Sequence, residues 1–432
     1  MNRLLLLVLI PFVLLNCSFN PNSKIWNKED NKFEDDKNLK KINFTDKQKT
    51  IELNPSVKID LLDINTKENF DKNQNNFGSL RYQGLLEKIA NYKFNKFNNI
   101  NELNFEPLFL RDSLIFFDKK GSIIHYDKKS NIIWKKNYYK KSEKKLNPKL
   151  SFYKKDKNIV VIDDIGKIYL LNSFNGDLIW MSNNTYPFNS DIKSSKGKLF
   201  GVDLNNTLRC YEIDDGSKCW KYQTESSLTL SDSKHSIIIY KDNVIFSNSL
   251  GDITSIDISS GSVDWQLPTQ SNLILSKTYN FRNSKLVGDN KSVFFSNNQN
   301  QFYSADIETG IINWENKVNS SLTPVIINNF IFTISEEGFL YILQKKEGNI
   351  IKITDLYKGY KTKDRKKIKP VGFLIANEKL YLSNNDGTLI IVNISTGKVI
   401  KTQKISRGPL SKPFINNNRL YIIKNGSIIE YN

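Results

Sequence analysis

The sequence predicts an all-β fold, namely an eight-bladed β-propeller of four-stranded antiparallel blades. Three observations predict it. A hairpin-like segment with fixed glycine and aromatic positions recurs eight times along the chain. The copies follow one another at intervals of 38 to 49 residues, which is typical of propeller blades. The last copy lacks its outer strand, so strands from the two ends of the chain are expected to close the ring together.

The segment from Gly166 to Trp180 is the clearest copy. Gly166 opens it, an alternating apolar strand follows, Asn175-Gly176 forms a tight turn, and a second strand carries Trp180. Two apolar runs precede each opening residue, which gives four strands per copy. The other copies begin at Gly121, Asn206, Gly251, Asn300, Gly338, Gly387 and Gly426.

The missing outer strand of the last copy is expected from the segment Lys88 to Phe94. Its alternating Ala90, Tyr92 and Phe94 suit a strand with one buried face. We therefore place the propeller at 88–432. Lys88 to Phe94 would pair with the copy that begins at Gly426.

The start of the chain is read as a targeting segment and a tether. Residues 1–16 combine a short basic beginning with about a dozen apolar residues, as in a signal peptide. Leu14-Leu15-Asn16-Cys17 resembles the lipobox of bacterial lipoproteins, which implies a lipid on Cys17 and, with Ser18 next, sorting to the outer membrane. An ordinary signal peptide with an incidental cysteine is the alternative. Residues 17–87 are interpreted as a flexible polar tether with room for one short strand from Thr50 to Leu62.

The composition is basic, with a formal net charge of +18 from 63 Lys and Arg against 45 Asp and Glu. Such a charge raises the question of a nucleic-acid partner. Lys, Asn and Ile are abundant throughout the chain, so we interpret the charge as compositional bias and expect no nucleic-acid binding. The basic loop from Lys358 to Lys369 is read as solvated, with anionic lipid headgroups or an acidic partner as the alternative.

Cys210 and Cys219 lie on the two strands of one hairpin, around Asp215-Gly216. A regular register places them diagonally, at about 7–8 Å between Cα atoms. That separation exceeds the usual disulfide range of roughly 4.4–6.8 Å, and a bridge would need a bulge. The sequence thus favours two free or weakly linked thiols.

Five tryptophans occupy the position four residues after the hairpin turn, or its equivalent in the shorter first copy. We expect them to pack between neighbouring blades, with each indole N–H bonded to backbone. A shared quinone pocket is the alternative, but equivalent positions should face separate seams. The five are Trp134, Trp180, Trp220, Trp265 and Trp314.

No catalytic motif is apparent. His125 and His235 fall in different blades without partners at ligand spacing, and Asp163-Asp164 and Asp214-Asp215 are read as turn acids. We therefore expect no enzyme activity, no cofactor and no metal.

The repeat Gly-x-φ-x-x-φ-(Asp/Asn)-x-x-x-Gly-x-φ-x-Trp resembles that of pyrroloquinoline-quinone-type propellers. Together with the lipobox, the tether and a single ring, it resembles the BamB family of lipoproteins of the outer-membrane β-barrel assembly machinery. The resemblance implies a non-catalytic scaffold on the periplasmic side of the outer membrane. Its partner would be the barrel insertase BamA, with nascent outer-membrane proteins as a further partner.

The resemblance also implies a docking loop. Thr224 to Ser231 looks like the family's BamA-binding loop, with Leu228 and Leu230 at its two leucines and Ser231 where the family has Arg. Arg282 and Asn283 stand near the family's second contact, without its acidic residues. The leucines could instead continue a strand into a blade core. Two other functions stay open: a quinoprotein dehydrogenase, and a generic envelope propeller that binds glycan or protein.

Overall fold

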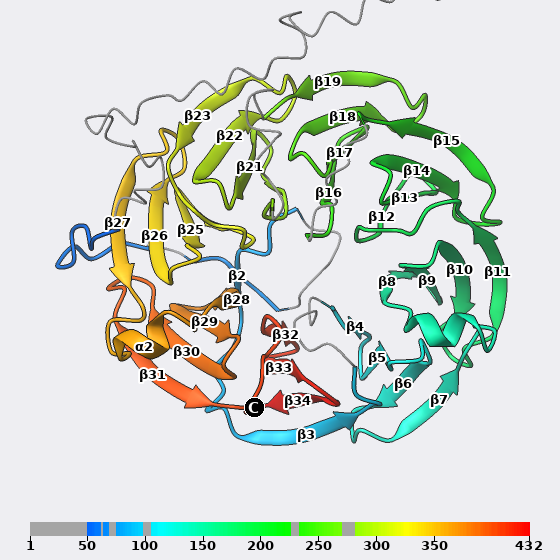
Figure 1. Ribbon diagram of the computed structural model, residues 1–432, viewed down its shortest axis with the longest axis horizontal. Coiled ribbons are helices and arrows are strands. Elements are labelled where there is room, and N and C mark those ends of the chain that lie inside the picture. Colours follow the sequence, from blue (N-terminus) through cyan, green and yellow to red (C-terminus); the bar gives the residue numbers. More distant parts are fainter. Residues whose placement is uncertain (1–49, 62–63, 69–74, 98–104, 226–232, 270–280) are drawn as a thin grey trace, which may run out of the picture. The chain divides into compact units, whose positions relative to one another are not determined.

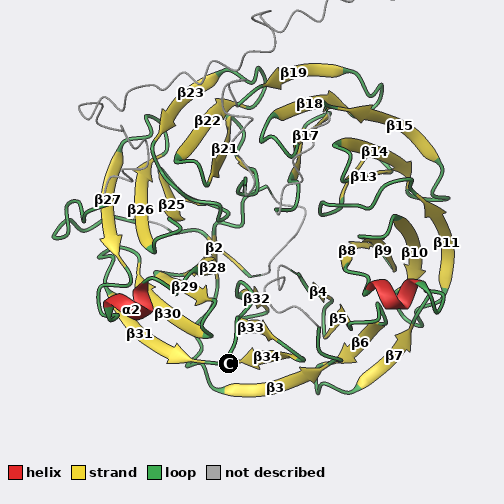
Figure 2. Cartoon of the chain, in the orientation of Figure 1, coloured by secondary structure: helices red, strands yellow, loops and turns green. Residues whose placement is uncertain are grey.

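The computed structural model describes residues 50–61, 64–68, 75–97, 105–225, 233–269 and 281–432, and contacts group them into one compact unit, Thr50–Asn432. The strands of this part form eight sheets. Figure 1 shows these sheets side by side around a ring, and Figure 2 shows how little of the described chain is helical. The predicted eight-bladed propeller is confirmed.

The four strands of each blade run in chain order from the ring centre outwards, apart from the outermost strand of blade 8. From the centre outwards, blade 1 holds β4 (Leu108–Phe109), β5 (Ser113–Phe117), β6 (Ile123–Asp127) and β7 (Ile132–Lys136). Blade 2 holds β8 (Leu150–Lys155), β9 (Asn158–Asp163), β10 (Lys167–Asn172) and β11 (Leu178–Asn183). Blade 3 holds β12 (Lys193–Ser195), β13 (Lys198–Val202), β14 (Thr207–Glu212) and β15 (Lys218–Gln223). Blade 4 holds β16 (Ile237–Tyr240), β17 (Asn243–Ser247), β18 (Ile253–Asp257) and β19 (Val263–Leu267).

The second half of the ring repeats this order. Blade 5 holds β20 (Val287–Gly288), β21 (Ser292–Asn297), β22 (Gln301–Asp306) and β23 (Ile312–Asn316). Blade 6 holds β24 (Val325–Ile327), β25 (Phe330–Ile334), β26 (Phe339–Gln344) and β27 (Ile350–Asp355). Blade 7 holds β28 (Pro370–Ala376), β29 (Lys379–Asn384), β30 (Thr388–Asn393) and β31 (Val399–Lys404). Blade 8 holds β32 (Phe414–Asn416), β33 (Arg419–Lys424), β34 (Ser427–Tyr431) and, outermost, β3 (Lys88–Lys93).

The residue that opens each copy adopts a left-handed backbone, which explains why only Gly or Asn stands there. Gly166, for example, has a φ of 94°, and Asn206 has a φ of 55°. In the first five copies an acid or amide three residues before the opening residue fastens the turn, and Ser335 does so in the sixth. Asp163 accepts hydrogen bonds from the backbone N–H groups of Ile165 (3.1 Å) and Lys167 (2.7 Å). Asp163, and likewise Asp215 through the Ser217 amide (2.8 Å), therefore have the structural role that the sequence indicates.

Blade 8 closes the ring as predicted. β3 pairs antiparallel with β34 in Figure 1, so the outermost strand of this blade comes from the other end of the propeller sequence. The Tyr92 hydroxyl donates a hydrogen bond of 2.6 Å to the buried Glu430 carboxylate and links the two strands through their side chains. Backbone hydrogen bonds and a side-chain hydrogen bond thus both join β3 to β34 and close the ring.

The described part of the tether range lies against the ring. β2 (Ser79–Leu80) pairs parallel with β28, and β1 (Thr66–Lys67) pairs with β2, which extends the blade 7 sheet to six strands. The side chain of Asn75 bonds the backbone of Ile239 in blade 4, and that of Asn76 bonds Ile326 in blade 6. The expected boundary at residue 88 therefore falls inside the compact unit, whose described contacts begin at Thr50.

The blade 6 outer edge carries another part of this segment. Leu53 and Ile353 exchange two backbone hydrogen bonds of 3.1 Å, which adds one antiparallel bridge to β27. Further along, the Ile59 amide donates to the Ser395 carbonyl (2.9 Å), and the Ser395 hydroxyl donates to the Ile59 carbonyl (2.7 Å). The strand-like alternation from Thr50 thus corresponds to a segment that docks on blades 6 and 7.

Apolar cores lie between neighbouring blades. One cluster joins Tyr92 of blade 8, Phe117 of blade 1 and Tyr169 of blade 2, all fully or almost fully buried. Another joins Phe200 of blade 3 to Phe246 of blade 4. Since each blade buries both faces against its neighbours, the ring needs every blade for its core.

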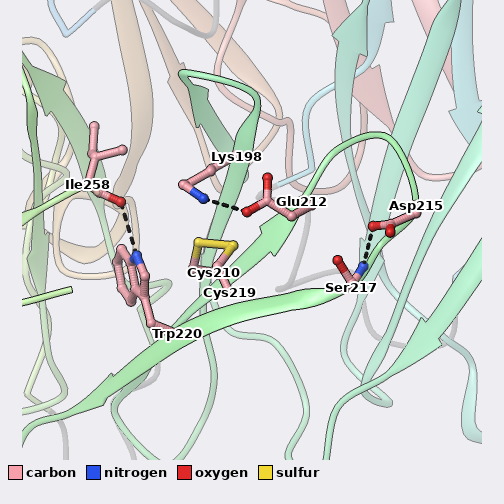
Figure 3. Close-up of a disulfide and its surroundings, with 8 residues drawn as sticks. All are labelled: Lys198, Cys210, Glu212, Asp215, Ser217, Cys219, Trp220 and Ile258. Carbon is pink, nitrogen blue, oxygen red and sulfur yellow. Dashed lines mark hydrogen bonds and ion pairs between the residues drawn. A yellow bond between two sulfur atoms is a disulfide. The ribbon is translucent and has the colours of Figure 1, made fainter. Parts of the chain in front are cut away.

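The expectation of free thiols is wrong, because Cys210 and Cys219 form a disulfide with a Cα–Cα distance of 5.3 Å. Figure 3 shows the bridge between β14 and β15, beside Trp220. The pairing of these strands shifts by one residue between Arg209 and Tyr211. This bulge replaces the diagonal offset of a regular register and brings the two cysteines within bonding range.

The described helical segments are short, namely η2 (Glu143–Leu146) and α2 (Thr362–Arg365). Within the described ranges, neither helix has the length or the apolar character of a membrane span.

Candidate functional site

The predicted tryptophans all lie in seams between blades. Trp180 of blade 2 donates its indole N–H to the Ile213 carbonyl of blade 3 (3.0 Å), and Trp220 donates to Ile258 of blade 4 (3.0 Å; Figure 3). Trp134 and Trp314 make the same bond to Ser173 and Lys345, each at 3.1 Å. Among described residues, the buried Nε1 of Trp265 has no hydrogen-bond partner, although its ring covers Gly310 in the same way.

Lysine replaces tryptophan at this position in blades 6 and 7. Lys352 is fully buried, and its stem packs on the turn glycine Gly397 of blade 7. Its ammonium donates to the carbonyls of Asn54 (3.3 Å), Pro55 (2.9 Å) and Val57 (2.6 Å). Lys401 of blade 7 is exposed, because its neighbour blade 8 is built from β34 and β3 and has no hairpin turn at that place.

Two of the predicted docking residues, Arg282 and Asn283, lie in the loop that leads from blade 4 to blade 5, on one face of the ring. Arg282 pairs with Glu336, in the turn between β25 and β26 of blade 6, at 2.9 Å. The backbone N–H of Asn283 donates to the Ser233 hydroxyl (3.2 Å), so the loop after blade 4 contacts the end of the loop after blade 3. Leu228, Leu230 and Ser231 in that loop, and Cys17 near the start of the chain, lie outside the described residues.

The base of the loop after blade 3 is firmly held. The Thr224 amide donates to the Asn206 carbonyl (3.2 Å), and the Asn206 side chain donates to Glu225 (3.1 Å) and to Ser249 of blade 4 (2.9 Å). Phe281 lies over Gly251, where an added Cβ would come within 2.9 Å of its ring. The start of the first loop and the end of the second are therefore held in fixed positions.

A cavity of about 450 Å³ opens on the same face at the ring centre. Phe77, Gly78 and Leu80 of the N-terminal segment line it from one side. Residues that precede the innermost strands of several blades line it from the others. Its basic lining residues are Lys234, Arg282, Lys285, Lys369 and Lys412, and its acidic ones are Glu106 and Glu336.

Three of these lysines belong to one ionic network. Lys285 pairs with Glu106 at 3.0 Å and also with Asp191. Lys412 pairs with Glu106, and Lys234 lies 3.9 Å from Asp191 while donating to the Ser151 hydroxyl at 2.9 Å. Five blades thus contribute charged side chains to one place.

Burial and charge act differently on the three ammonium groups. Burial lowers the pKa of Lys234 and of Lys412. Burial also opposes the charge of Lys285, but Asp191 and Glu106 outweigh it and raise the pKa of that lysine. Lys285 is therefore the member held most firmly in its charged form, between two carboxylates.

The basic loop beside the cavity is mostly exposed. It has seven Lys and Arg residues and one Asp between Lys358 and Lys369. Arg365 pairs with Asp355 at 2.6 Å, and Lys358 pairs with Glu52 at 2.8 Å. The loop thereby also holds the N-terminal segment.

Neither histidine belongs to the cavity. His125 lies 2.8 Å from the Ser113 hydroxyl, and burial lowers its pKa. His235 is buried at the inner end of the seam between blades 3 and 4, and burial lowers its pKa to about 4. In the described ranges no three His, Cys, Asp or Glu side chains gather as metal ligands would.

Sequence reasoning missed the ionic network. It also missed the lysine clamp, by which we mean the hydrogen bonds of Lys352 to the carbonyls of residues 54–57. Glu106, Asp191, Lys285 and Lys412 each stand two residues before the innermost strand of a blade, so an alignment of the copies on that strand would have shown a charged position. The clamp carried a weaker signal, namely a lysine where a tryptophan was expected.

The ring of eight four-stranded sheets with tryptophan-filled seams defines a β-propeller of the pyrroloquinoline-quinone-like repeat class. A sequence model of the outer membrane protein assembly factor BamB family matches residues 119–354, more than half of the chain. The chain belongs to this family. No curated protein matches its sequence significantly.

Solved structures share the fold at low sequence identity. BamB from Moraxella catarrhalis superposes with a TM-score of 0.64 at 16% identity, covering 80% of this chain and 99% of that one. The computationally designed Ika8 protein gives 0.60 at 13% identity, covering 79% and 99%. The quinohemoprotein alcohol dehydrogenase from Comamonas testosteroni gives 0.58 at 9% identity, covering 82% and 78%. At these identities the likeness concerns the fold alone.

Proposed function

We propose that this chain is a non-catalytic scaffold of the outer-membrane protein assembly complex, which binds the insertase subunit BamA through its rim loops and assists the folding of β-barrel proteins. Membership of the BamB family supports the proposal. The structural observation that carries it is the contact between Asn283 and Ser233, because it brings the two loops of the predicted docking surface together.

A rim of this kind suits protein binding in physical terms. A specific interface needs about 800 Å² on each partner, which a wide ring face provides. Loops that start from fixed positions lose less conformational entropy on binding than free loops. The hydrogen bonds of Asn206 to Glu225 and Ser249 provide such fixed positions.

The test is a pull-down of the full-length lipidated chain from envelope membranes, with wild type and Leu228→Asp/Leu230→Asp compared. Leu146→Asp is the matched control, since Leu146 is a 65% exposed leucine on another loop between blades. We expect wild type and the control to recover BamA, and the double variant to lose it.

Two other results would change the proposal. Equal recovery of BamA by all three proteins would mean that the leucines are not part of the interface, although the chain still binds the complex. No recovery by wild type would remove the assembly role, and the purified protein would then be assayed for quinone absorbance and for glycan binding.

Anchoring to the periplasmic face of the outer membrane through Cys17 is part of the same proposal. The lipobox-like Leu14-Leu15-Asn16-Cys17 supports it. Cys17→Ser should move the protein from the membrane fraction to the soluble periplasmic fraction. An unchanged fraction would argue against a lipid anchor.

Nascent barrel strands are a second proposed partner. Apolar pairs are exposed on β11, as Leu178 and Ile179, and at the beginning of β23, as Ile311 and Ile312, each at least 41% exposed. The antiparallel bridge between Leu53 and Ile353 joins another segment to the outer edge of β27, which supports β-augmentation at such edges. A photo-crosslinker at Ile179 should capture unfolded barrel proteins in cells, and one at the exposed Lys363 should not.

A further inference from the structure

We propose that the cavity at the ring centre binds a small polyanion, a molecule with two or more carboxylate or phosphate groups. The proposal concerns a ligand site inside the ring and is independent of docking by the rim loops. It rests on the charge of the lining, the fixed position of that charge and the size of the cavity.

The lining carries an excess of positive charge. Five basic side chains, from Lys234 in blade 4 round to Lys412 in blade 8, meet two carboxylates, those of Glu106 and Glu336. Asp191, which pairs with Lys285 but does not line the cavity, brings the carboxylates to three. An anion with two or more negative charges would neutralise the remaining positive charge. Its attraction to the ammonium groups would be stronger than in bulk water, because the cavity partly excludes water.

The basic groups are held in place. Lys285 lies between two carboxylates, and Lys412 lies near the Phe77 and Phe414 rings, at 5.5 and 5.3 Å from their centroids. Lys234 is fastened by the Ser151 hydroxyl. Since the side chains are already ordered, an incoming anion needs to immobilise few of them.

The walls also supply neutral donors that suit an oxyanion. Ser233, Asn283, Thr323 and Asn385 line the cavity. Hydroxyl and amide groups of this kind combine with ammonium groups to give short, charge-assisted hydrogen bonds.

The size of the cavity favours a small molecule over a protein segment. Its volume of about 450 Å³ lies in the usual range for small-ligand sites. Phe77, Gly78 and Leu80 line one side of the cavity, and Leu80 belongs to β2, which pairs with β28. A bound protein segment would have to displace β2 from β28 to pass through the ring centre. A compact anion needs no such movement.

The test is isothermal titration calorimetry on the full-length chain with citrate, pyrophosphate and inorganic phosphate at matched ionic strength. The variants are Lys234→Met and Lys412→Met, with Lys366→Met as control because Lys366 is exposed on the neighbouring basic loop. We expect saturable binding of at least one polyanion by wild type and by the control. Each cavity variant should bind about tenfold or more weakly.

The ligand series distinguishes the sources of the anion. Preference for citrate assigns a polycarboxylate, and preference for pyrophosphate or phosphate assigns a phosphate-bearing ligand. Circular dichroism first confirms that each variant is folded; if Lys412→Met is not, Lys369→Met at the cavity rim replaces it. Absence of saturable binding by wild type, or equal binding by all variants, would overturn the proposal and leave the network a structural one.

Discussion

A tryptophan fills some of the seams between blades and a lysine fills another, and the two side chains make different contacts. In the seam after blade 2, Trp180 covers the turn glycine Gly216 and bonds a backbone carbonyl of the next blade. In the seam after blade 6, the stem of Lys352 covers Gly397, but its ammonium bonds three carbonyls of residues 54–57. A tryptophan seam is complete within two blades, whereas the lysine seam needs a third segment.

The lysine seam therefore joins the ring to the N-terminal segment. A charged ammonium reaches several carbonyls at once, which a single indole N–H cannot do. Its hydrogen bonds are also stronger than neutral ones. The sequence thus departs from the repeat where another part of the chain has to be held.

Loss of a tryptophan should have the largest effect. Trp134→Ala removes a buried ring and its bond to Ser173, and we expect a loss of about 3–5 kcal/mol in unfolding free energy. Lys401→Ala, at the equivalent but exposed position, should change it by less than about 0.5 kcal/mol. Urea denaturation followed by circular dichroism measures both, and similar values would abolish the distinction between the positions.

The turn glycine under a tryptophan should be the next most sensitive position. Gly216 and Gly197 of blade 3 have φ values of 70° and 74°, so alanine costs about 1–2 kcal/mol at either. At Gly216 the new Cβ would also lie 2.5 Å from the Trp180 ring, while nothing stands within 4 Å at Gly197. We expect about 2–5 kcal/mol for Gly216→Ala, again from urea denaturation.

Acid should weaken the seam between blades 3 and 4 through His235. Its pKa is about 4 in the fold against an ordinary 6.5, so between these values the unfolded chain holds a proton that the folded chain lacks. Stability from this group therefore falls as the pH is lowered from 6.5 to 4, by about 3 kcal/mol.

His235→Gln provides the measurement of this effect. Asp163, whose pKa burial raises to about 6, acts in the opposite direction: its contribution is lost as the pH rises through that value. The difference between wild type and His235→Gln, from denaturation midpoints at pH 4.5 and 7, isolates the histidine. If the stability difference between wild type and His235→Gln is the same at both pH values, His235 does not titrate differently in the folded and unfolded chain over this range.

The lysine seam should respond locally. Lys352→Met removes hydrogen bonds from a charged donor, each worth about 1.5–3 kcal/mol, but it leaves the ring closed. We expect amide exchange at Leu53 to speed up about 10- to 100-fold, with little change at Tyr92 in the closing strand. Hydrogen exchange with mass spectrometry distinguishes this from general destabilisation, which would accelerate both.

Much of the ring could be predicted because its requirements are local. A left-handed turn admits few residues, so Gly166 and Asn206 mark the copies in the sequence, and alternation marked the closing strand around Tyr92. The disulfide was missed because one bulge between Arg209 and Tyr211 changes the register, and alternation alone does not reveal a bulge.

The central cavity could not be predicted in the same way. Lys412 and Glu106 meet although they are 306 residues apart, and the pairing depends on the ring being closed. The docking of Asn75 and Asn76 depends on single amide side chains that reach inner strands, which leave no periodic pattern. Contacts of this kind become visible only in the folded ring.

The pairing of β3 with β34 has a consequence for the kinetics of folding. Tyr92 and Glu430 are 338 residues apart, so blade 8 forms only after the whole propeller sequence has been synthesised. Bringing such distant strands together carries a large loop-closure entropy and slows folding. Until then the faces of blades 1 and 7 that pack against blade 8 stay exposed. The ring therefore cannot close before β34, the last strand of the chain, is made.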